Sequence, residues 1–226
     1  MQPLQILPQR CAPIDRYHNK TVIFYLHGFS SSPASRKARF FAERLSSSGH
    51  QVSIPTLDGG DFENLTLTRQ LRILEEEAHG RPVSLIGSSM GGYLATLYAA
   101  KHPEVRRVVL MAPAFGFARR WPDKLGLQVT DAWRREGSME VFHYGSQQKR
   151  RVGYQLLEDG LQYPDYPKCG QPCLIFHGQK DDVVPVDFSK EFVKRQPNAE
   201  LHVWDSDHEL TNVLEPMWEK VKTFLA

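Results

Sequence analysis

The 226-residue chain has an ordinary globular composition, with 41% hydrophobic and 24% charged residues. Its net charge of +2 is too small to indicate nucleic acid as a partner. No apolar run approaches the roughly 20 residues that span a bilayer, and the first ten residues lack the basic and apolar segments of a secretory signal. Cys11, Cys169 and Cys173 have no zinc-type spacing, so we expect reduced thiols in a cytoplasmic protein without a bound metal.

The first half of the chain alternates short apolar segments with longer amphipathic ones. Residues 21–26 (TVIFYL) have apolar side chains at both alternating sets of positions, which is typical of a strand that is buried on both faces. A helix is expected next, with Ser32 as its N-cap, Pro33 as its first residue and Gly49 just after its end. The same periodicities then predict two strands, at 51–55 and 82–87, and two helices, at 65–78 and 93–102.

The second half continues this pattern after one interruption. It predicts strands at 105–113, 172–178 and 199–204 and a final helix at 214–225. Alternation of this kind indicates an α/β fold, with a mostly parallel sheet covered by helices on both faces. The 58 residues between Pro113 and Pro172 contain no clear core strand and are too many for a plain connection. We therefore expect a small cap or lid inserted at about 115–171 within a single domain spanning 1–226.

A predicted strand is followed at once by the sequence Gly87-Ser88-Ser89-Met90-Gly91 and then by a predicted helix. In this setting the pattern Gly-x-Ser-x-Gly is typical of a nucleophile elbow, in which the central serine stands exposed on a sharp strand-to-helix turn. The glycines let strand and helix approach closely, and the helix N-terminus favours negative charge near Ser89. The alternative is a Gly/Ser turn without chemistry. Ser88 lies off the serine position of the motif.

A serine hydroxyl is a weak nucleophile until a base accepts its proton, and the base needs an acid to orient it. Downstream, Asp181 and Asp182 follow the fifth predicted strand, and His208 follows the sixth. Both loops leave the carboxyl ends of their strands, where open α/β sheets build their sites. We therefore predict that Ser89 is the nucleophile, His208 the base and Asp181 the acid. Asp181 is preferred to Asp182 because it lies four residues after His177, as in a His-Gly-x-x-Asp loop.

The other candidates for the base and the acid are weaker. His143, in the expected cap, is the alternative base, and Asp207, directly before His208, is the alternative acid. Five other histidines fit surface loops or the ends and interiors of regular elements: His18, His50, His79, His102 and His202.

The tetrahedral intermediate of acyl transfer also needs hydrogen-bond donors for its oxyanion. One is expected to be the backbone N–H of Met90, which follows the nucleophile. The second is expected from the loop after the first strand, HGFSSSP, as the backbone N–H of Phe29. Gly28 would let that loop pass close to the elbow.

Four segments, YLHGFSSSP, GSSMGGYLAT, HGQKDDVVP and SDH, occur in this order between Tyr25 and His208. Together they resemble the α/β-hydrolase superfamily, and within it the small, short-capped serine esterases and thioesterases. The resemblance implies an eight-stranded sheet, whereas the pattern gives six strands, and the N-terminal antiparallel pair is not evident in residues 1–20. The resemblance also implies the roles of the residues named above: a triad of Ser89, Asp181 and His208, with Phe29 and Met90 as oxyanion donors.

The sequence thus predicts a cofactor-free serine hydrolase that cleaves small-molecule carboxylic esters or thioesters through an acyl-enzyme. A peptidase or a C–C bond hydrolase would use the same triad, and a catalytically silent binding protein on this fold is the alternative outside the enzymes. Basic residues of the expected cap would either bind an anionic ligand or form a solvated face: Arg119, Arg120, Arg134, Arg135, Lys149, Arg150 and Arg151. Its aromatic residues would form an acyl pocket or the cap's own core: Phe115, Phe117, Trp121, Trp133, Phe142 and Tyr144.

Overall fold

In the computed structural model, which describes residues 21–226, one parallel sheet carries the fold. Its strand order is β2-β1-β3-β4-β7-β8, and all its pairings are parallel. The strands are β1 (Val22–Leu26), β2 (Gln51–Ser53), β3 (Val83–Ser88), β4 (Val105–Met111), β7 (Cys173–Gly178) and β8 (Ala199–Trp204). The predicted α/β fold is confirmed, with the six strands that the pattern indicated. Cys11 and the first 20 residues lie outside the described residues.

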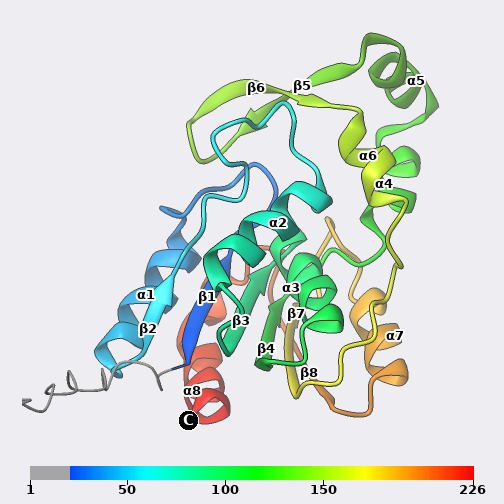
Figure 1. Cartoon of the computed structure of the whole chain (residues 1–226). Helices are drawn as coiled ribbons and strands as arrows, with labels where there is room; N and C mark the ends of the chain where they lie inside the picture. The colour runs from blue at the N-terminus through cyan, green and yellow to red at the C-terminus, as the bar shows by residue number, and fades with distance from the viewer. Residues whose placement is uncertain (1–20) are drawn as a thin grey trace, which may run out of the picture.

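Helices cover both faces of this sheet (Figure 1). On one face α1 (Arg36–Ser47) and α8 (Leu214–Leu225) pack against side chains such as Ile23, Ile86 and Val109. On the other face lie α2 (Leu67–Ala78), α3 (Met90–Lys101) and α7 (Asp187–Arg195). Strand residues alternate between the two faces, so β1 and β3 contribute to both cores and are buried along their whole length.

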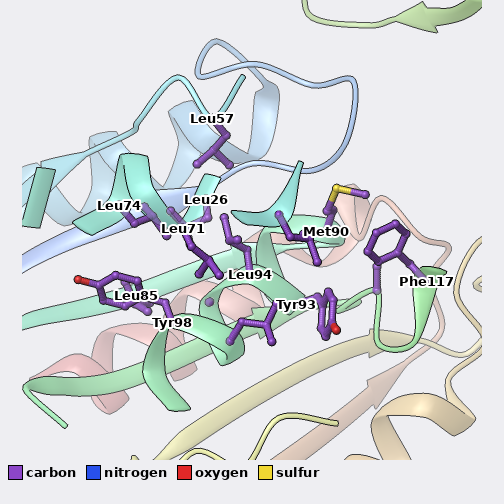
Figure 2. Close-up of a cluster of buried hydrophobic side chains, with 14 of the residues drawn as sticks. Leu26, Leu57, Leu71, Leu74, Leu85, Met90, Tyr93, Leu94, Tyr98 and Phe117 are labelled. Atoms are coloured by element: carbon purple, nitrogen blue, oxygen red, sulfur yellow. The ribbon is translucent and has the colours of Figure 1, made fainter. Parts of the chain in front are cut away.

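The core beneath α3 explains why that helix has almost no polar face. Figure 2 shows Leu94 and Tyr98 of α3 among Leu26 and Leu85 of the sheet and Leu71 of α2. Nearly every residue of α3 is buried, because the helix lies between the sheet, α2 and the segment that follows β4. A helix apolar on all sides is expected only in such an enclosed position. Ser89, the residue directly before α3, is therefore attached to a helix that is packed on all sides.

The helices differ from the sequence-based expectations at several points. The N-cap of α1 is Ser35, not Ser32, and its Oγ accepts from the N–H of Ala38 at 3.4 Å. Ser32 instead accepts from the N–H of Ala34 at 3.3 Å, so it stabilises a turn within the loop. Both serines are good caps, and propensity alone could not choose between them. α3 begins at Met90 rather than at residue 93, and α7 was not predicted at all.

The segment between β4 and β7 forms elements of its own, away from the main sheet. These are α4 (Phe117–Leu125), α5 (Leu127–Glu136), an antiparallel hairpin of β5 (Ser138–His143) and β6 (Gln148–Gly153), and α6 (Gln155–Gly160). Figure 1 shows the hairpin and α5 above the sheet, far from the C-terminus. The hairpin contacts two loops of the sheet, since Gly145 N–H donates to Ser30 O at 3.2 Å and Gly153 N–H donates to Glu63 O at 2.8 Å.

Candidate active site

Ser89 occupies a strained turn between β3 and α3. Its backbone has φ 53° and ψ −118°, a left-handed conformation that a non-glycine residue adopts only at a cost. Two hydrogen bonds to β4 and the loop after it hold the turn: Ser89 N–H donates to Met111 O at 2.9 Å, and Ser89 O accepts from Ala114 N–H at 3.0 Å. The sharp strand-to-helix turn that the Gly-x-Ser-x-Gly pattern predicts is therefore present in the backbone.

The glycines of the pattern are required by close backbone approaches. A Cβ added to Gly87 would lie 2.3 Å from the carbonyl oxygen of Gly91. A Cβ added to Gly91 would lie 2.2 Å from the carbonyl oxygen of Leu26 at the end of β1. Both distances are far below van der Waals contact with rigid backbone atoms, so only glycine lets β1, β3 and the first turn of α3 meet here.

The structure brings Ser89, His208 and Asp181 together in one hydrogen-bonded row. His208 Nε2 lies 3.0 Å from Ser89 Oγ, and His208 Nδ1 lies 2.7 Å from Asp181 Oδ2. A carboxylate can only accept, so Nδ1 carries the proton and the neutral ring presents Nε2 as an acceptor for the serine hydroxyl. This is the geometry that a serine nucleophile with a histidine base requires.

The carboxylate of Asp181 is buried and fully engaged. Its Oδ1 accepts from the backbone N–H groups of Val183 and Val184 at 2.9 and 2.8 Å. Burial by itself raises the pKa of Asp181, but hydrogen bonds from His177 and His208 outweigh burial and hold that pKa below its ordinary value. Asp181 is therefore an anion at neutral pH, which is the form that orients an imidazole.

His177, near the end of β7, is a hydrogen-bonded neighbour of Asp181. Its Nε2 lies 2.8 Å from the carbonyl oxygen of Val184 and 3.1 Å from Asp181 Oδ2, and its Nδ1 lies 2.7 Å from Ser189 Oγ. A carbonyl oxygen accepts only, so Nε2 carries a proton that both oxygens share. His177 is completely buried, so it supports Asp181 and has no access to a substrate.

Two backbone N–H groups near Ser89 are available to an oxyanion. Met90 is the first residue of α3, so its N–H has no acceptor within the helix. The N–H of Phe29 has no backbone acceptor within residues 21–226. Gly28 brings the Phe29 loop against the elbow, because a Cβ on Gly28 would lie 3.3 Å from Ser89 Cβ. The two residues singled out from sequence thus line the same cavity as Ser89.

A cavity of about 930 Å³ opens over Ser89 and His208. One part of its wall is apolar and comes from the loop after β1 and from the segment between β4 and β7: Phe29, Phe117, Trp121, Leu125, Met139 and Val141. The ring of Trp121 packs edge-on against Phe29 and Phe117, with centroids 5.0 and 5.4 Å apart. The volume is in the range of pockets that enclose small organic molecules.

The residues that were alternative candidates for the base and the acid do not contact Ser89 or His208 in this way. His143 Nδ1 bonds Ser146 Oγ at 3.0 Å inside the hairpin turn, and its ring packs on Phe62 rather than on Ser89. Asp207 Oδ1 accepts from the N–H of Glu209 at 3.0 Å, so it shapes the loop that carries His208. Asp182 is exposed. None of these three lines the cavity over Ser89.

The basic residues that the sequence assigned to the cap mostly form ion pairs with acidic residues of the chain. Pairs of 3.1 to 3.8 Å join six of them to carboxylates: Arg119–Asp165, Arg134–Asp131, Arg135–Glu136, Lys149–Glu140, Arg150–Asp58 and Arg151–Glu63. Arg120 alone of this set lines the cavity. Of the aromatic residues, Phe117, Trp121 and Tyr144 line the cavity, whereas Phe115 and Trp133 are core residues and Phe142 is exposed.

Sequence reasoning missed Lys37, a buried cation in the cavity wall. The one available signal was its position next to Ala38, on the edge of the apolar face of α1. In the part of the chain that the structure describes, no group of three or more His, Cys, Asp or Glu residues could hold a metal ion. The same residues contain no helix that is both long and apolar enough to cross a bilayer.

Comparisons with known proteins give a family and a fold. A family model described as "Uncharacterised protein family (UPF0227)" matches residues 22–226. The chain is 28% identical to the non-heme chloroperoxidase CPO-A1 of Kitasatospora aureofaciens, over 73% of this chain and 74% of that protein. It is 28% identical to 2-hydroxy-6-oxononadienedioate/2-hydroxy-6-oxononatrienedioate hydrolase 1 of Dechloromonas aromatica, over 82% and 79% of the two chains. It is 26% identical to bovine mitochondrial palmitoyl-protein thioesterase ABHD10, over 83% and 67%.

Solved structures of hydrolases share this fold. A putative hydrolase from Agrobacterium vitis S4 superposes with a TM-score of 0.79 at 24% identity, covering 92% of this chain and 88% of that one. Est1E of Butyrivibrio proteoclasticus superposes with a TM-score of 0.75 at 21% identity, covering 94% and 90%. At these identities the likeness establishes the fold, which is that of the α/β hydrolases.

Proposed function

Because the chain belongs to the UPF0227 family and has the α/β-hydrolase fold, we propose that it is a serine hydrolase that cleaves carboxylic esters or thioesters. The single observation that carries the proposal is the hydrogen-bonded row from Ser89 through His208 to Asp181. Catalytically silent members of a fold have no need to keep such a row beside an open cavity and a strained serine.

The proposed reaction proceeds through an acyl-enzyme. His208 Nε2 accepts the hydroxyl proton of Ser89 as Oγ attacks the carbonyl carbon, and Asp181 stabilises the imidazolium that forms. The N–H groups of Phe29 and Met90 donate to the oxyanion of the tetrahedral intermediate. His208 then returns its proton to the leaving alcohol or thiol. A water molecule, deprotonated by His208, attacks the acyl-enzyme; His208 then gives that proton to the departing Oγ of Ser89, and the free acid leaves.

We further propose that residues 115–171 act as a cap whose apolar wall receives the acyl chain. Trp121 and Phe117 line the cavity from α4, and Met139 and Val141 line it from β5. No metal or cofactor takes part in this proposal, and the substrate is a small molecule. A cytoplasmic setting is proposed from the free thiols Cys169 and Cys173, which are buried and unbridged.

The direct test is the Ser89→Ala variant assayed on p-nitrophenyl butyrate. We expect kcat to fall by about 10⁴- to 10⁶-fold, because triad members act as a unit. Ser88→Ala is the matched control, since Ser88 adjoins the nucleophile but has no contact with His208 in the row described. A fluorophosphonate probe should label the native protein and Ser88→Ala but not Ser89→Ala. Near-normal turnover by Ser89→Ala would refute the proposal.

A second candidate is hydrolysis of a carbon–carbon bond by the same triad. It is favoured by the similarity to the 2-hydroxy-6-oxononadienedioate hydrolase of Dechloromonas aromatica. Assaying that dioate beside p-nitrophenyl esters separates the two reactions. Turnover of the dioate with a kcat/KM well above that of the esters would favour the second candidate, and both reactions should disappear in Ser89→Ala.

A further inference from the structure

The cavity over Ser89 has a polar wall as well as an apolar one. The polar wall is built from the loop after β1, the first turn of α1 and the loop that carries His208. Five charged side chains line the whole cavity: Arg36, Lys37, Arg120, Lys124 and Glu209. Four of the five are cations, so the cavity favours a negatively charged occupant. This imbalance differs from the surface of the cap, where the basic residues are paired with carboxylates.

Lys37 is the cation whose position is hardest to explain by folding alone. It is the second residue of α1 and only 7% exposed. Its Nζ lies 3.5 Å from Oε2 of Glu209, whose side chain is 65% exposed. Burial lowers the pKa of Lys37, and Glu209 only partly opposes this effect. A buried ammonium needs hydrogen-bond acceptors, and one long contact to a solvated carboxylate leaves donors of Lys37 free.

Tyr25 supplies a second polar group in the same wall. Its side chain is 1% exposed in β1, and its hydroxyl has no hydrogen bond of ordinary geometry in residues 21–226, although the Ser88 side chain interacts with it weakly. Buried hydroxyl groups are nearly always hydrogen-bonded, so this one can donate to a further acceptor in the cavity. Burial and the charge of Glu209 raise the pKa of Tyr25 and outweigh the opposite effect of Ser88, so the group keeps its proton.

The polar wall includes the loop that carries His208, the proposed base. Glu209 directly follows His208, whose Nε2 must protonate the leaving alcohol or thiol. Phe29, the proposed oxyanion donor, instead packs on Trp121 of the apolar wall. With its acyl chain on the apolar wall, as proposed above, an ester would place its leaving group beside His208 and the polar wall.

From this arrangement we propose that the leaving group of the natural substrate carries a carboxylate, which binds Lys37 in place of Glu209 and accepts from the Tyr25 hydroxyl. The inference rests on the proposed function and specifies the substrate class of the same site. The alternative is a purely structural role, in which the Lys37–Glu209 ion pair holds the His208 loop against α1. Loss of a structural ion pair would affect the turnover of all substrates alike, whereas loss of a binding subsite would affect charged and neutral leaving groups differently.

A pair of esters with matched leaving groups separates these roles. 3-Carboxyphenyl butyrate and 3-carbamoylphenyl butyrate differ in charge but hardly in shape, and the ratio of their kcat/KM values is the measured quantity. We expect the native protein to prefer the carboxylate by about 10- to 100-fold, the value of a hydrogen bond to a charged group. Lys37→Met should abolish this preference, and Lys37→Arg should retain part of it.

Two further variants control the test. Glu209→Gln removes the competing carboxylate and should raise the preference for the charged ester, a change that impaired folding could not produce. Arg39→Met removes an exposed cation of the same helix and should leave the ratio unchanged. Turnover of both esters without preference, or an equal loss on both in Lys37→Met, would overturn the subsite alone. No turnover of either ester by the native protein would instead refute the proposed function.

Discussion

Replacing Asp181 by asparagine removes the negative charge beside His208 and so tests the role proposed for this carboxylate. The substitution preserves shape but changes which atoms can accept. Oδ1 accepts from two backbone N–H groups, of Val183 and Val184, so the amide oxygen of the introduced asparagine is forced to that side. The amide NH₂ then faces His208 Nδ1 and His177 Nε2. His208 must release its Nδ1 proton to become an acceptor, and Nε2 becomes protonated.

The expected magnitude follows from the lost base. With Nε2 protonated, the neutral ring of His208 can no longer accept the proton of Ser89, and the imidazolium loses its counter-charge. A triad in the wrong tautomer loses about 10⁴-fold in kcat, which corresponds to about 5.5 kcal/mol of transition-state stabilisation. His177 cannot relieve the clash by changing its own tautomer, because the carbonyl of Val184 also needs the Nε2 proton. The loss should therefore not be recovered by local rearrangement.

The assay is the hydrolysis of p-nitrophenyl butyrate over pH 6 to 9, with circular dichroism to verify the fold. Asp182→Asn is the control, because this neighbouring carboxylate is exposed and should keep kcat within about twofold, as distant surface changes do. A kcat for Asp181→Asn within tenfold of the native value would refute the predicted change in the tautomer of His208. It would show that His208 is oriented by something other than the carboxylate.

The remaining predictions concern stability. The lowered pKa of Asp181 contributes stability above about pH 4, its unfolded pKa, and this contribution is lost as the pH falls through the folded pKa. In urea unfolding, the stability difference between native protein and Asp181→Asn should therefore shrink from pH 7 to pH 3; a constant difference would contradict it. Gly91→Ala places a Cβ 2.2 Å from Leu26 O and should cost about 1–3 kcal/mol or more, whereas Gly170→Ala, with nothing within 4 Å, should cost little. Leu94→Ala, fully buried in α3, should cost about 2–5 kcal/mol without changing the pH dependence of activity.

The main sheet was predictable because its signal is local. Strand β1 is a continuous apolar run and β7 begins with one, and that pattern is typical of strands buried on both faces. The segment between β4 and β7 was not predictable in detail. The strands of its two-stranded hairpin have mainly exposed and half-buried residues. Helices α4 and α5 also have few buried residues. These elements are stabilised by distant partners, such as Val152 O, which accepts from the indole of Trp133 at 2.9 Å.

The candidate site likewise contains residues that could be identified from the sequence and one that could not. Ser89, Asp181 and His208 could be named from sequence because each occupies the loop at a strand's carboxyl end, and chain order fixes which loops meet. Their catalytic role remains a prediction. Lys37 could not be named, because its burial depends on the approach of the His208 loop to α1, a contact between residues 172 positions apart. Sequence periodicity within one helix carries no information about such a contact.

Each of the three residues is held by backbone contacts that do not depend on the other two. Ser89 is fixed by its hydrogen bond to Met111 of β4, and Asp181 by the N–H groups of Val183 and Val184. The His208 loop is pressed against the end of β7, where a Cβ on Gly178 would lie 2.3 Å from the carbonyl oxygen of Asp207. A site anchored in this way is preorganised before any ligand binds. Removing one side chain should therefore leave the other two in register, so losses of activity in single variants measure chemistry rather than collapse of the site.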